Sequence, residues 1–229
     1  MNYPGGKNGA GVTQFLCNQV PPHRTLIECF AGSAALTRAL RPAERTILVE
    51  ADPRAGADLL LMDLGRPRVQ VVRGDALQFL RCHAWEPETF LYLDPPYLME
   101  TRTAKRRYYA CEFDTVAQHR ELLDLIRTLP CMVMISHYSA PLYQLALADW
   151  RSAFVRTTNR AGKQTEEWVW CSYPEPQELH DYRYLGANYR EREYLSRMKK
   201  RWKAKLAAMP VTKRYALLSA LEEMKRGEE

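Results

Sequence analysis

The chain has 229 residues, 46% of them hydrophobic and 26% charged, which suits one α/β core with a small appendage. No apolar run approaches the roughly 20 residues that span a membrane, and the first residues lack a signal-peptide core, so we expect a cytoplasmic protein. The net charge of +6 lies in the C-terminal fifth: residues 181–229 contain 13 Lys/Arg and 7 Asp/Glu, whereas residues 1–180 contain 20 of each. The six cysteines and five histidines lack ligand spacing, so we expect reduced cysteines and no metal site.

Short apolar runs alternate with helical patterns along most of the chain. Strands are predicted at residues 25–29, 46–49, 69–72, 90–93, 131–136, 154–158 and 166–171. Helices are predicted at residues 12–20, 34–40, 53–63, 76–83, 115–129 and 141–148. This rhythm predicts an α/β fold with a doubly wound, mostly parallel seven-stranded sheet, whose last two strands form an antiparallel edge hairpin.

The pattern changes after residue 174, where two polar, charged helices are predicted at residues 178–207 and 211–226. We therefore expect a first domain at residues 1–174 and a basic helical extension at residues 175–229. Surplus positive charge on an appended element suggests a polyanionic partner, although a solvated helical face explains it equally well. An apolar stripe on the last helix favours docking on the core, with dimerisation as the alternative.

In doubly wound sheets, ligands bind beyond the carboxyl ends of the strands. The first such end is followed by Phe30-Ala31-Gly32-Ser33, small residues that let a ligand approach the backbone and a helix N-terminus, or that merely form a turn. Glu50 follows the second strand and is placed to bind ribose hydroxyls, with Asp52 as the competitor or as a helix cap. Asp75 follows the third strand and either contacts an adenine amine or caps the next helix.

The fourth strand ends in Asp94-Pro95-Pro96-Tyr97. The first proline disfavours helical geometry at Asp94, and neither proline has a backbone N–H, so the segment forms a rigid corner. The Asp94 carboxylate and the Pro95 carbonyl are acceptors beside the Tyr97 ring, a combination suited to the amine of a planar base. The alternative is a strand that ends in a proline-rich turn.

Together these motifs resemble Dam-like DNA adenine methyltransferases of the compact phage or prophage type. The resemblance covers roughly residues 1–175 in the family's order. It rests on segments that read Tyr3-Pro4-Gly5-Gly6-Lys7, Phe30-Ala31-Gly32-Ser33, Glu50-Ala51-Asp52, Gly74-Asp75-Ala76, Asp94-Pro95-Pro96-Tyr97, Ser136-His137-Tyr138 and Gly162-Lys163-Gln164-Thr165-Glu166-Glu167. It implies a class I, Rossmann-like methyltransferase that transfers a methyl group from S-adenosyl-L-methionine to N6 of an adenine flipped out of double-stranded DNA.

The resemblance also implies residue roles. The cofactor would be bound by Tyr3, Lys7, Phe30, Ala31, Gly32, Ser33, Glu50, Ala51, Asp75, Ala76 and Asp94. Asp94 and Pro95 would accept the hydrogens of the target amine, with Pro96 in the rigid corner and Tyr97 stacking on the base. An acidic first position favours adenine, because relatives that act on cytosine begin the motif with Ser and those that act on glutamine begin it with Asn.

Three departures from the family pattern matter. Ala34 stands where a second glycine is common, which the small neighbours should tolerate. His137 stands where a glycine is common, and we interpret it as a substituted turn residue rather than a DNA contact. Only about 60 residues separate Gly32 from Asp94, which leaves little room for the target-recognition domain that larger relatives insert there.

We therefore expect basic segments after the Asp94-Pro95-Pro96-Tyr97 motif to recognise the target DNA. The expected DNA contacts are Arg102, Lys105, Arg106, Arg107 and Tyr108 after the motif, and Lys199, Lys200 and Arg201 in the extension. We expect a monomer or weak dimer, not bound to membranes. The competing hypotheses are an RNA adenine methyltransferase and a cofactor-dependent DNA-binding protein without turnover; neither the recognition sequence nor a partner nuclease for restriction-modification can be read here.

Overall fold

The computed structural model describes residues 11–66, 68–102, 111–158 and 164–227. Its order of elements is α1 (Val12–Cys17), β1 (Thr25–Cys29), α2 (Ala35–Ala39), β2 (Arg45–Glu50), α3 (Pro53–Leu61), β3 (Val69–Arg73), α4 (Ala76–Cys82), β4 (Thr89–Leu93), the 3-10 turn Met99–Thr101, α5 (Val116–Ile126), β5 (Met132–Tyr138), α6 (Pro141–Ala146), β6 (Arg151–Thr158), β7 (Gln164–Cys171), α7 (Tyr189–Ala208) and α8 (Val211–Arg226). All seven predicted strands are present in the described residues.

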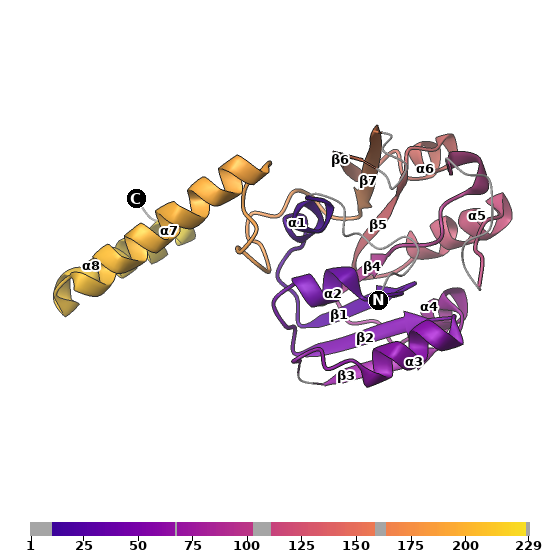
Figure 1. The fold of residues 1–229 in the computed structure, drawn as a ribbon, viewed down its shortest axis with the longest axis horizontal. Coiled ribbons are helices and arrows are strands. Elements are labelled where there is room, and N and C mark those ends of the chain that lie inside the picture. Colours follow the sequence, from indigo (N-terminus) through magenta and orange to yellow (C-terminus); the bar gives the residue numbers. More distant parts are fainter. Residues whose placement is uncertain (1–10, 67, 103–110, 159–163, 228–229) are drawn as a thin grey trace. The chain divides into compact units, whose positions relative to one another are not determined.

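The strands form one sheet in the order β3-β2-β1-β4-β5-β7-β6. Pairs among β1 to β5 are parallel, whereas β7 pairs antiparallel with both β5 and β6. The predicted doubly wound sheet with an antiparallel edge hairpin is thus confirmed (Figure 1).

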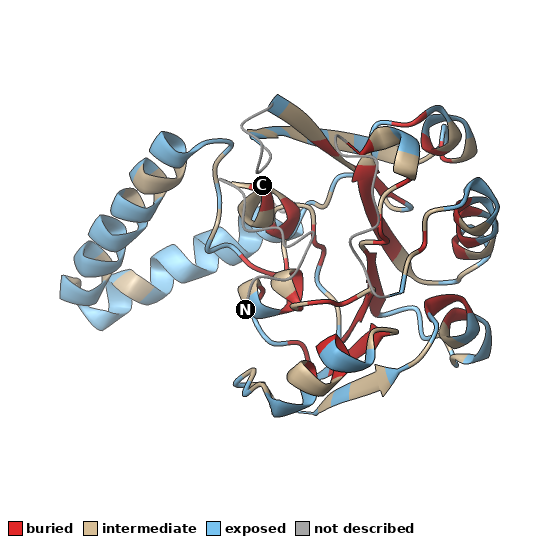
Figure 2. Ribbon diagram, turned by 45° about the vertical axis from the view of Figure 1, so that its right-hand side comes forward, coloured by how far each residue is buried: buried red, intermediate tan, exposed pale blue. Residues whose placement is uncertain are grey.

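Helices cover both faces of the sheet because the central strands are apolar on both sides. One core packs α4, α5 and α6 against side chains such as Ile27, Leu91 and Val133. The opposite core packs α1 and α2 against alternate positions such as Leu26 and Phe90, and α3 lies over Leu48. Figure 2 shows the buried strands in red between helices whose outer faces are exposed. Because strand side chains alternate between faces, near-continuous apolar strands require two covering layers.

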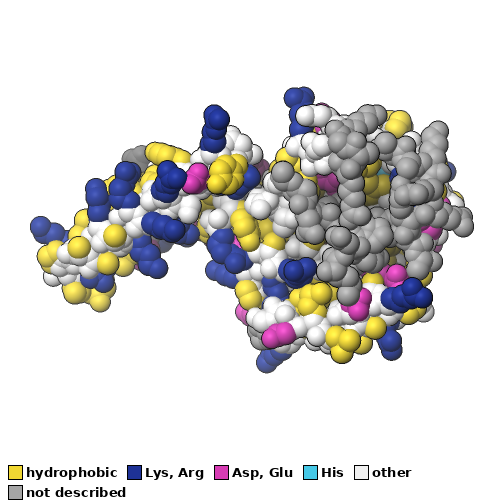
Figure 3. All heavy atoms as spheres, viewed as in Figure 1, with side chains coloured by type: hydrophobic (Ala, Val, Ile, Leu, Met, Phe, Trp, Pro, Cys, Tyr) yellow, Lys and Arg dark blue, Asp and Glu magenta, His cyan; other side chains and the backbone are white. Residues whose placement is uncertain are grey.

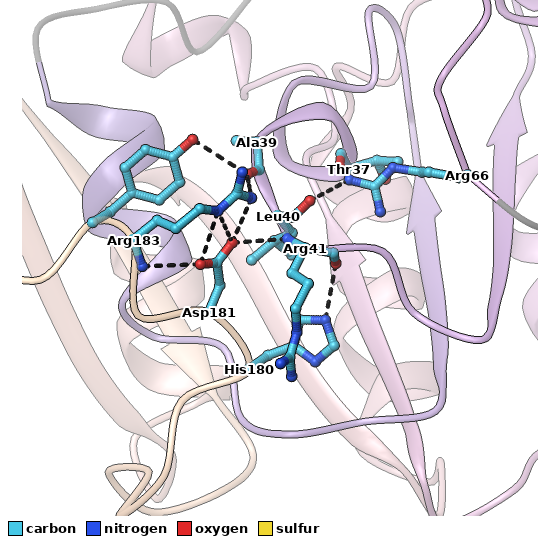
Figure 4. A network of polar contacts seen from close by, with 9 residues as sticks. Thr37, Ala39, Leu40, Arg41, Arg66, His180, Asp181 and Arg183 are labelled. Carbon is cyan, nitrogen blue, oxygen red and sulfur yellow. Dashed lines mark hydrogen bonds and ion pairs between the residues drawn. The ribbon is translucent and has the colours of Figure 1, made fainter. Parts of the chain in front are cut away.

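The chain divides into two compact units, Met1–Tyr184 and Leu185–Glu229. The boundary therefore lies later than residue 174, and the helix predicted to begin at residue 178 begins at Tyr189. The intervening residues belong to the sheet unit because His180 and Asp181 are buried in a polar network with α2 (Figure 4). The Asp181 carboxylate accepts the N–H of Arg41 at 2.8 Å, and His180 Nε2 is 2.9 Å from the Arg41 carbonyl.

The second unit consists of α7 and α8, neither of which contains a buried residue. Figure 3 shows Lys and Arg side chains along these helices. Residues 185–229 contain 12 Lys/Arg and 6 Asp/Glu, so residues 1–184, with 21 of each, have no net charge. The whole formal charge of the chain thus belongs to the helical unit.

Candidate active site

A pocket lies at the carboxyl ends of β1 to β4, where the sequence places its conspicuous motifs. Its lining includes every described residue that was predicted to bind the cofactor: Phe30, Ala31, Gly32, Ser33, Glu50, Ala51, Asp75, Ala76 and Asp94. Parallel pairing explains this gathering, because the ends of neighbouring parallel strands meet at one edge of a sheet. Tyr3 and Lys7 lie outside the described residues.

The turn after β1 alternates between ordinary and left-handed backbone. Phe30, Gly32 and Ala34 have φ values of 56°, 50° and 51°, and the turn closes through Ala34 N–H to the Ala31 carbonyl at 2.6 Å. Left-handed geometry suits glycine and strains other residues. Ala34 therefore adopts a backbone conformation that glycine would adopt more easily, and the turn brings the backbone of Gly32 to the pocket.

Glu50 holds this turn against the next strand end. Its buried carboxylate accepts the N–H of Gly32 at 2.7 Å and the N–H of Asp52 at 2.8 Å. Burial raises the pKa of Glu50, whereas these two backbone hydrogen bonds oppose the rise. Glu50 therefore both lines the pocket and fixes its shape, and its oxygens retain lone pairs that can accept hydroxyl groups.

The other two strand-end acids cap helices. Asp52 accepts the N–H of Arg54 at 2.8 Å at the start of α3, while Asp75 accepts the N–H of Gln78 at 2.9 Å at the start of α4. Asp75 also lines the pocket, so its two predicted roles are compatible. Of the two alternatives after β2, it is Glu50 that faces the pocket.

Glu28 is a pocket residue that the sequence predictions missed. It lies within β1, and its carboxylate accepts the N–H of Thr37 at 2.8 Å, so this donor at the start of α2 is occupied. Burial, aided by the charge of Asp94, raises the pKa of Glu28 to about 7 against the opposing hydrogen bonds from Thr37. The signal that could have identified it is the presence of a glutamate within a buried, mostly apolar strand.

Asp94 follows β4 and lines the same pocket. A hydrogen-bonded chain reaches it from the core: the Tyr92 hydroxyl is 2.9 Å from Ser136 Oγ, and Ser136 Oγ donates to Asp94 Oδ1 at 3.0 Å. Pro96 also lines the pocket, and both prolines of the motif are buried. The carboxylate is therefore held from behind by β4 and β5 while it faces the pocket.

Tyr97 turns from this pocket toward β5 and β7. Its hydroxyl donates to the carboxylate of buried Glu167 on β7. Its ring centroid lies 4.6 Å from those of His137 and Tyr138. Burial, followed by the charges of Asp94 and Glu167, raises the pKa of Tyr97 well above its ordinary value, so the phenol stays neutral.

His137 fixes the backbone beyond the motif. Its Nε2 accepts the N–H of Leu98 at 2.9 Å, so Nδ1 carries the proton and donates to the Tyr138 carbonyl at 2.7 Å. The interpretation of His137 as a turn residue is wrong, because it is fully buried within β5 and stacks on Tyr143.

Arg102 is not exposed, contrary to its predicted DNA contact. Its Nε donates to the Tyr97 carbonyl at 2.7 Å, and its other nitrogens bind Glu112 at 2.7 and 3.3 Å. The side chains of Arg102 and Glu112 are only 7% and 8% exposed. Because Glu112 lines the pocket, this ion pair joins the pocket wall to the backbone of the motif.

The remaining predicted DNA contacts stay predictions. Lys105, Arg106, Arg107 and Tyr108 lie outside the described residues, whereas Lys199, Lys200 and Arg201 are exposed on α7 of the helical unit. Among the described residues, no group of three or more His, Cys, Asp or Glu side chains could hold a metal ion. No described helix is long and apolar enough to cross a membrane.

The strand order and the pocket at the carboxyl ends of β1 to β4 decide the fold. It is a class I methyltransferase fold. Residues 14–122, slightly less than half of the chain, match the family model described as "Conserved hypothetical protein 95". No curated protein matches the chain.

Solved structures of methyltransferases resemble the chain at low identity. The N-methyltransferase NodS from Bradyrhizobium japonicum is 14% identical, with a TM-score of 0.51 over 72% of this chain and 94% of NodS. NodS in complex with S-adenosyl-L-homocysteine gives 0.50 over 69% and 84%, again at 14% identity. A dimethyladenosine transferase from Plasmodium falciparum is 12% identical, with a TM-score of 0.45 over 69% of this chain and 59% of the transferase. The 23S rRNA methyltransferase ErmE is 14% identical, with a TM-score of 0.44 over 76% of this chain and 70% of ErmE.

Proposed function

We propose that the protein is a site-specific adenine N6-methyltransferase that uses S-adenosyl-L-methionine and acts on DNA. The observation that carries the proposal is that one pocket is lined both by the strand-end residues Gly32, Glu50 and Asp75 and by Asp94, the acid of the Asp94-Pro95-Pro96-Tyr97 motif. A nucleoside cofactor and the amine that receives its methyl group could therefore bind side by side at the carboxyl ends of the strands.

The pocket residues fit this cofactor. Carboxylates at Glu50 and Asp75 suit ribose hydroxyls and an adenine amine, and Phe30 and Phe113, packed edge to face at 5.1 Å, supply apolar surface. The left-handed turn at Gly32 lets a ligand approach the backbone closely. Structures of NodS, which has the same fold, include a complex with S-adenosyl-L-homocysteine. When bound, S-adenosyl-L-methionine supplies a methyl group activated by a sulfonium, and the adenine nitrogen gains this group and loses one proton.

Asp94 and Pro95 would make the exocyclic amine of adenine a better nucleophile. Its lone pair is delocalised into the ring, and acceptors that take both amine hydrogens favour the pyramidal nitrogen in which the lone pair is available. The chain from Tyr92 through Ser136 fixes the Asp94 carboxylate at the pocket. Tyr97, fixed by Glu167, would pack against the base. Positioning and electrostatics then supply most of the rate acceleration.

DNA is the first candidate polymer because the motifs in roughly residues 1–175 resemble those of Dam-like enzymes. RNA is the second candidate, because none of the site chemistry described above distinguishes ribose from deoxyribose, which requires contacts to the 2′-hydroxyl. Exposed Lys199, Lys200 and Arg201 on α7 would bind phosphates of either polymer, which positions the substrate without reading its sequence.

The test is transfer of a radiolabelled methyl group to duplex DNA, single-stranded DNA and RNA, followed by digestion to nucleosides. We expect N6-methyladenine from DNA, and Asp94→Ala should abolish the product while binding of S-adenosyl-L-homocysteine changes by less than about threefold, or 0.7 kcal/mol. Asp124→Ala, which removes an exposed aspartate from α5, is the matched control. Product in RNA alone would replace DNA by RNA, and a methylated cytosine or protein would overturn the proposal.

A further inference from the structure

A second hollow of about 390 Å³ lies at the same edge of the sheet, outside the cofactor pocket. It is lined by Thr101, Tyr138, Ser139, Arg156, Gln164, Thr165 and Glu166. None of these residues lines the cofactor pocket.

The antiparallel hairpin explains why a hollow forms here. Tyr138 at the carboxyl end of β5 pairs with Glu167, and on the next strand Arg156 pairs with Glu166. The start of β7 and the end of β6 therefore lie at the edge where the parallel strands end, as Figure 1 shows beside β5. In strand order, the cofactor pocket lies over β1 to β4 and this hollow over β5, β7 and β6.

The hollow begins directly beside the proposed methylation site. The ring of Tyr138, which lines it, packs edge to face on the ring of Tyr97 at a centroid distance of 4.6 Å. Tyr97 is itself fixed by Glu167, the neighbour of Glu166 in the hollow. If Tyr97 holds the target base, the adjacent nucleotide of the nucleic acid would lie within reach of Tyr138.

The side chains of the hollow match one nucleotide. Arg156 has a side chain that is 73% exposed, and its contact with Glu166, 3.4 Å between Nε and Oε1, leaves the guanidinium accessible. Glu166 is also held by Trp168 Nε1 at 3.2 Å, so this carboxylate orients Arg156 from a fixed position. An accessible guanidinium suits a phosphate, an aromatic ring suits a base or sugar, and the exposed amide of Gln164 suits a base edge.

We propose that this hollow binds the nucleotide adjacent to the target adenine, with Arg156 on the phosphate that links the two nucleotides and Tyr138 against the neighbouring base or sugar. The inference rests on the proposed function and adds to it a subsite that reads the flanking position. Arg156 and Tyr138 are binding residues of this subsite, distinct from the methyl-transfer residues at Asp94 and Pro95.

The test couples one protein side chain to one group of the substrate. Oligonucleotides carrying the methylated adenine would contain an uncharged methylphosphonate at each linkage in turn, from three positions before the adenine to three after it. Affinity would be measured by fluorescence anisotropy in the presence of S-adenosyl-L-homocysteine, so that binding is read without turnover. The variants are Arg156→Ala and, as control, Arg24→Ala, which removes an exposed arginine that pairs with Glu44 and precedes the amino end of β1.

We expect one linkage beside the adenine at which neutralisation weakens wild-type and Arg24→Ala binding about tenfold but Arg156→Ala binding less than twofold. At the other linkages the three proteins should respond alike. Tyr138→Ala should likewise lose the penalty for an abasic site at the same flanking position. Arg156→Lys, which keeps the charge, should retain part of the effect and so separates phosphate binding from a folding defect.

Two results would overturn the inference. If wild type and Arg156→Ala respond equally at every linkage while methylation proceeds normally, the hollow is not a nucleotide subsite, and the proposed function stands. If the wild type binds and methylates no nucleic acid, the proposed function fails and this subsite with it.

Discussion

The buried ion pair between Arg102 and Glu112 gives the sharpest prediction about stability. Arg102→Met keeps a long apolar stem but leaves the Glu112 carboxylate, 8% exposed, without its guanidinium. It also removes the donor to the Tyr97 carbonyl. Removing one partner of a buried ion pair typically costs about 3–5 kcal/mol, because the remaining charge must be desolvated alone.

The matched control is Arg24→Met. Arg24 pairs with two glutamates, at 2.9 Å from Glu44 and 3.3 Å from Glu88, but the side chain of Arg24 is 61% exposed and those of both glutamates are 64% exposed. Exposed pairs contribute about 0–1 kcal/mol, so the control should lose little. Arg102→Met should lower the unfolding temperature by roughly 6–20 °C, at about 2–4 °C per kcal/mol for a unit of this size.

The double variant Arg102→Met with Glu112→Leu separates the charge from the packing. Because it removes both ions, it should be more stable than Arg102→Met alone. Urea unfolding followed by tryptophan fluorescence measures these differences chiefly in the sheet unit, which contains four of the five tryptophans. If Arg102→Met costs no more than Arg24→Met, or if the double variant is the least stable, the ion pair does not stabilise the motif as argued.

Three further predictions concern the pocket, pH and the helical unit. Glu50→Gln should weaken binding of S-adenosyl-L-homocysteine at least tenfold, about 1.4 kcal/mol by calorimetry, because an amide cannot accept both backbone N–H groups; Asp52→Asn should change it less than threefold. Burial, followed by the charge of His180, lowers the pKa of His23 to about 3 in the folded protein. As the pH falls, His23 therefore becomes protonated in the unfolded chain before it does in the folded one. The free energy of unfolding should then decrease as the pH drops below about 6.5. His23→Phe should remove up to about 1.4 kcal/mol per pH unit of that loss in urea titrations between pH 7 and 5, and an unchanged pH dependence would contradict it. Deleting residues 185–229 should leave the unfolding temperature of the sheet unit within a few degrees and reduce the salt dependence of nucleic-acid binding; an unchanged salt slope would show that α7 and α8 bind no phosphates.

Local patterns predicted the strands and the pocket well. The strands follow from short apolar runs, and parallel topology then brings residues as distant as Gly32 and Asp94 to one edge without any information on their contacts. The same rule could place Glu50 at this edge but could not distinguish it from Asp52. Their roles depend on which carboxylate turns toward the Gly32 backbone, a choice made by tertiary packing.

The errors occurred where a polar residue has a distant partner. Arg102 stands at the start of a basic segment, and the composition of that segment suggested that Arg102 is exposed. The partner of Arg102, Glu112, lies beyond the segment. His137 was interpreted by its position in a family pattern, whereas its partner is the backbone N–H of Leu98, in the segment after β4. The domain boundary was placed early because the polar residues around Asp181 resemble a charged helix, although they cap the backbone after α2.

The division of charge between the two units has a colloidal consequence. Residues 1–184 are formally neutral at pH 7, a condition in which proteins repel one another weakly and tend to associate. The helical unit adds six positive charges to this neutral body. The charge repulsion between copies of the protein therefore comes from the helical unit, and shortening this unit would shift the isoelectric point toward neutrality.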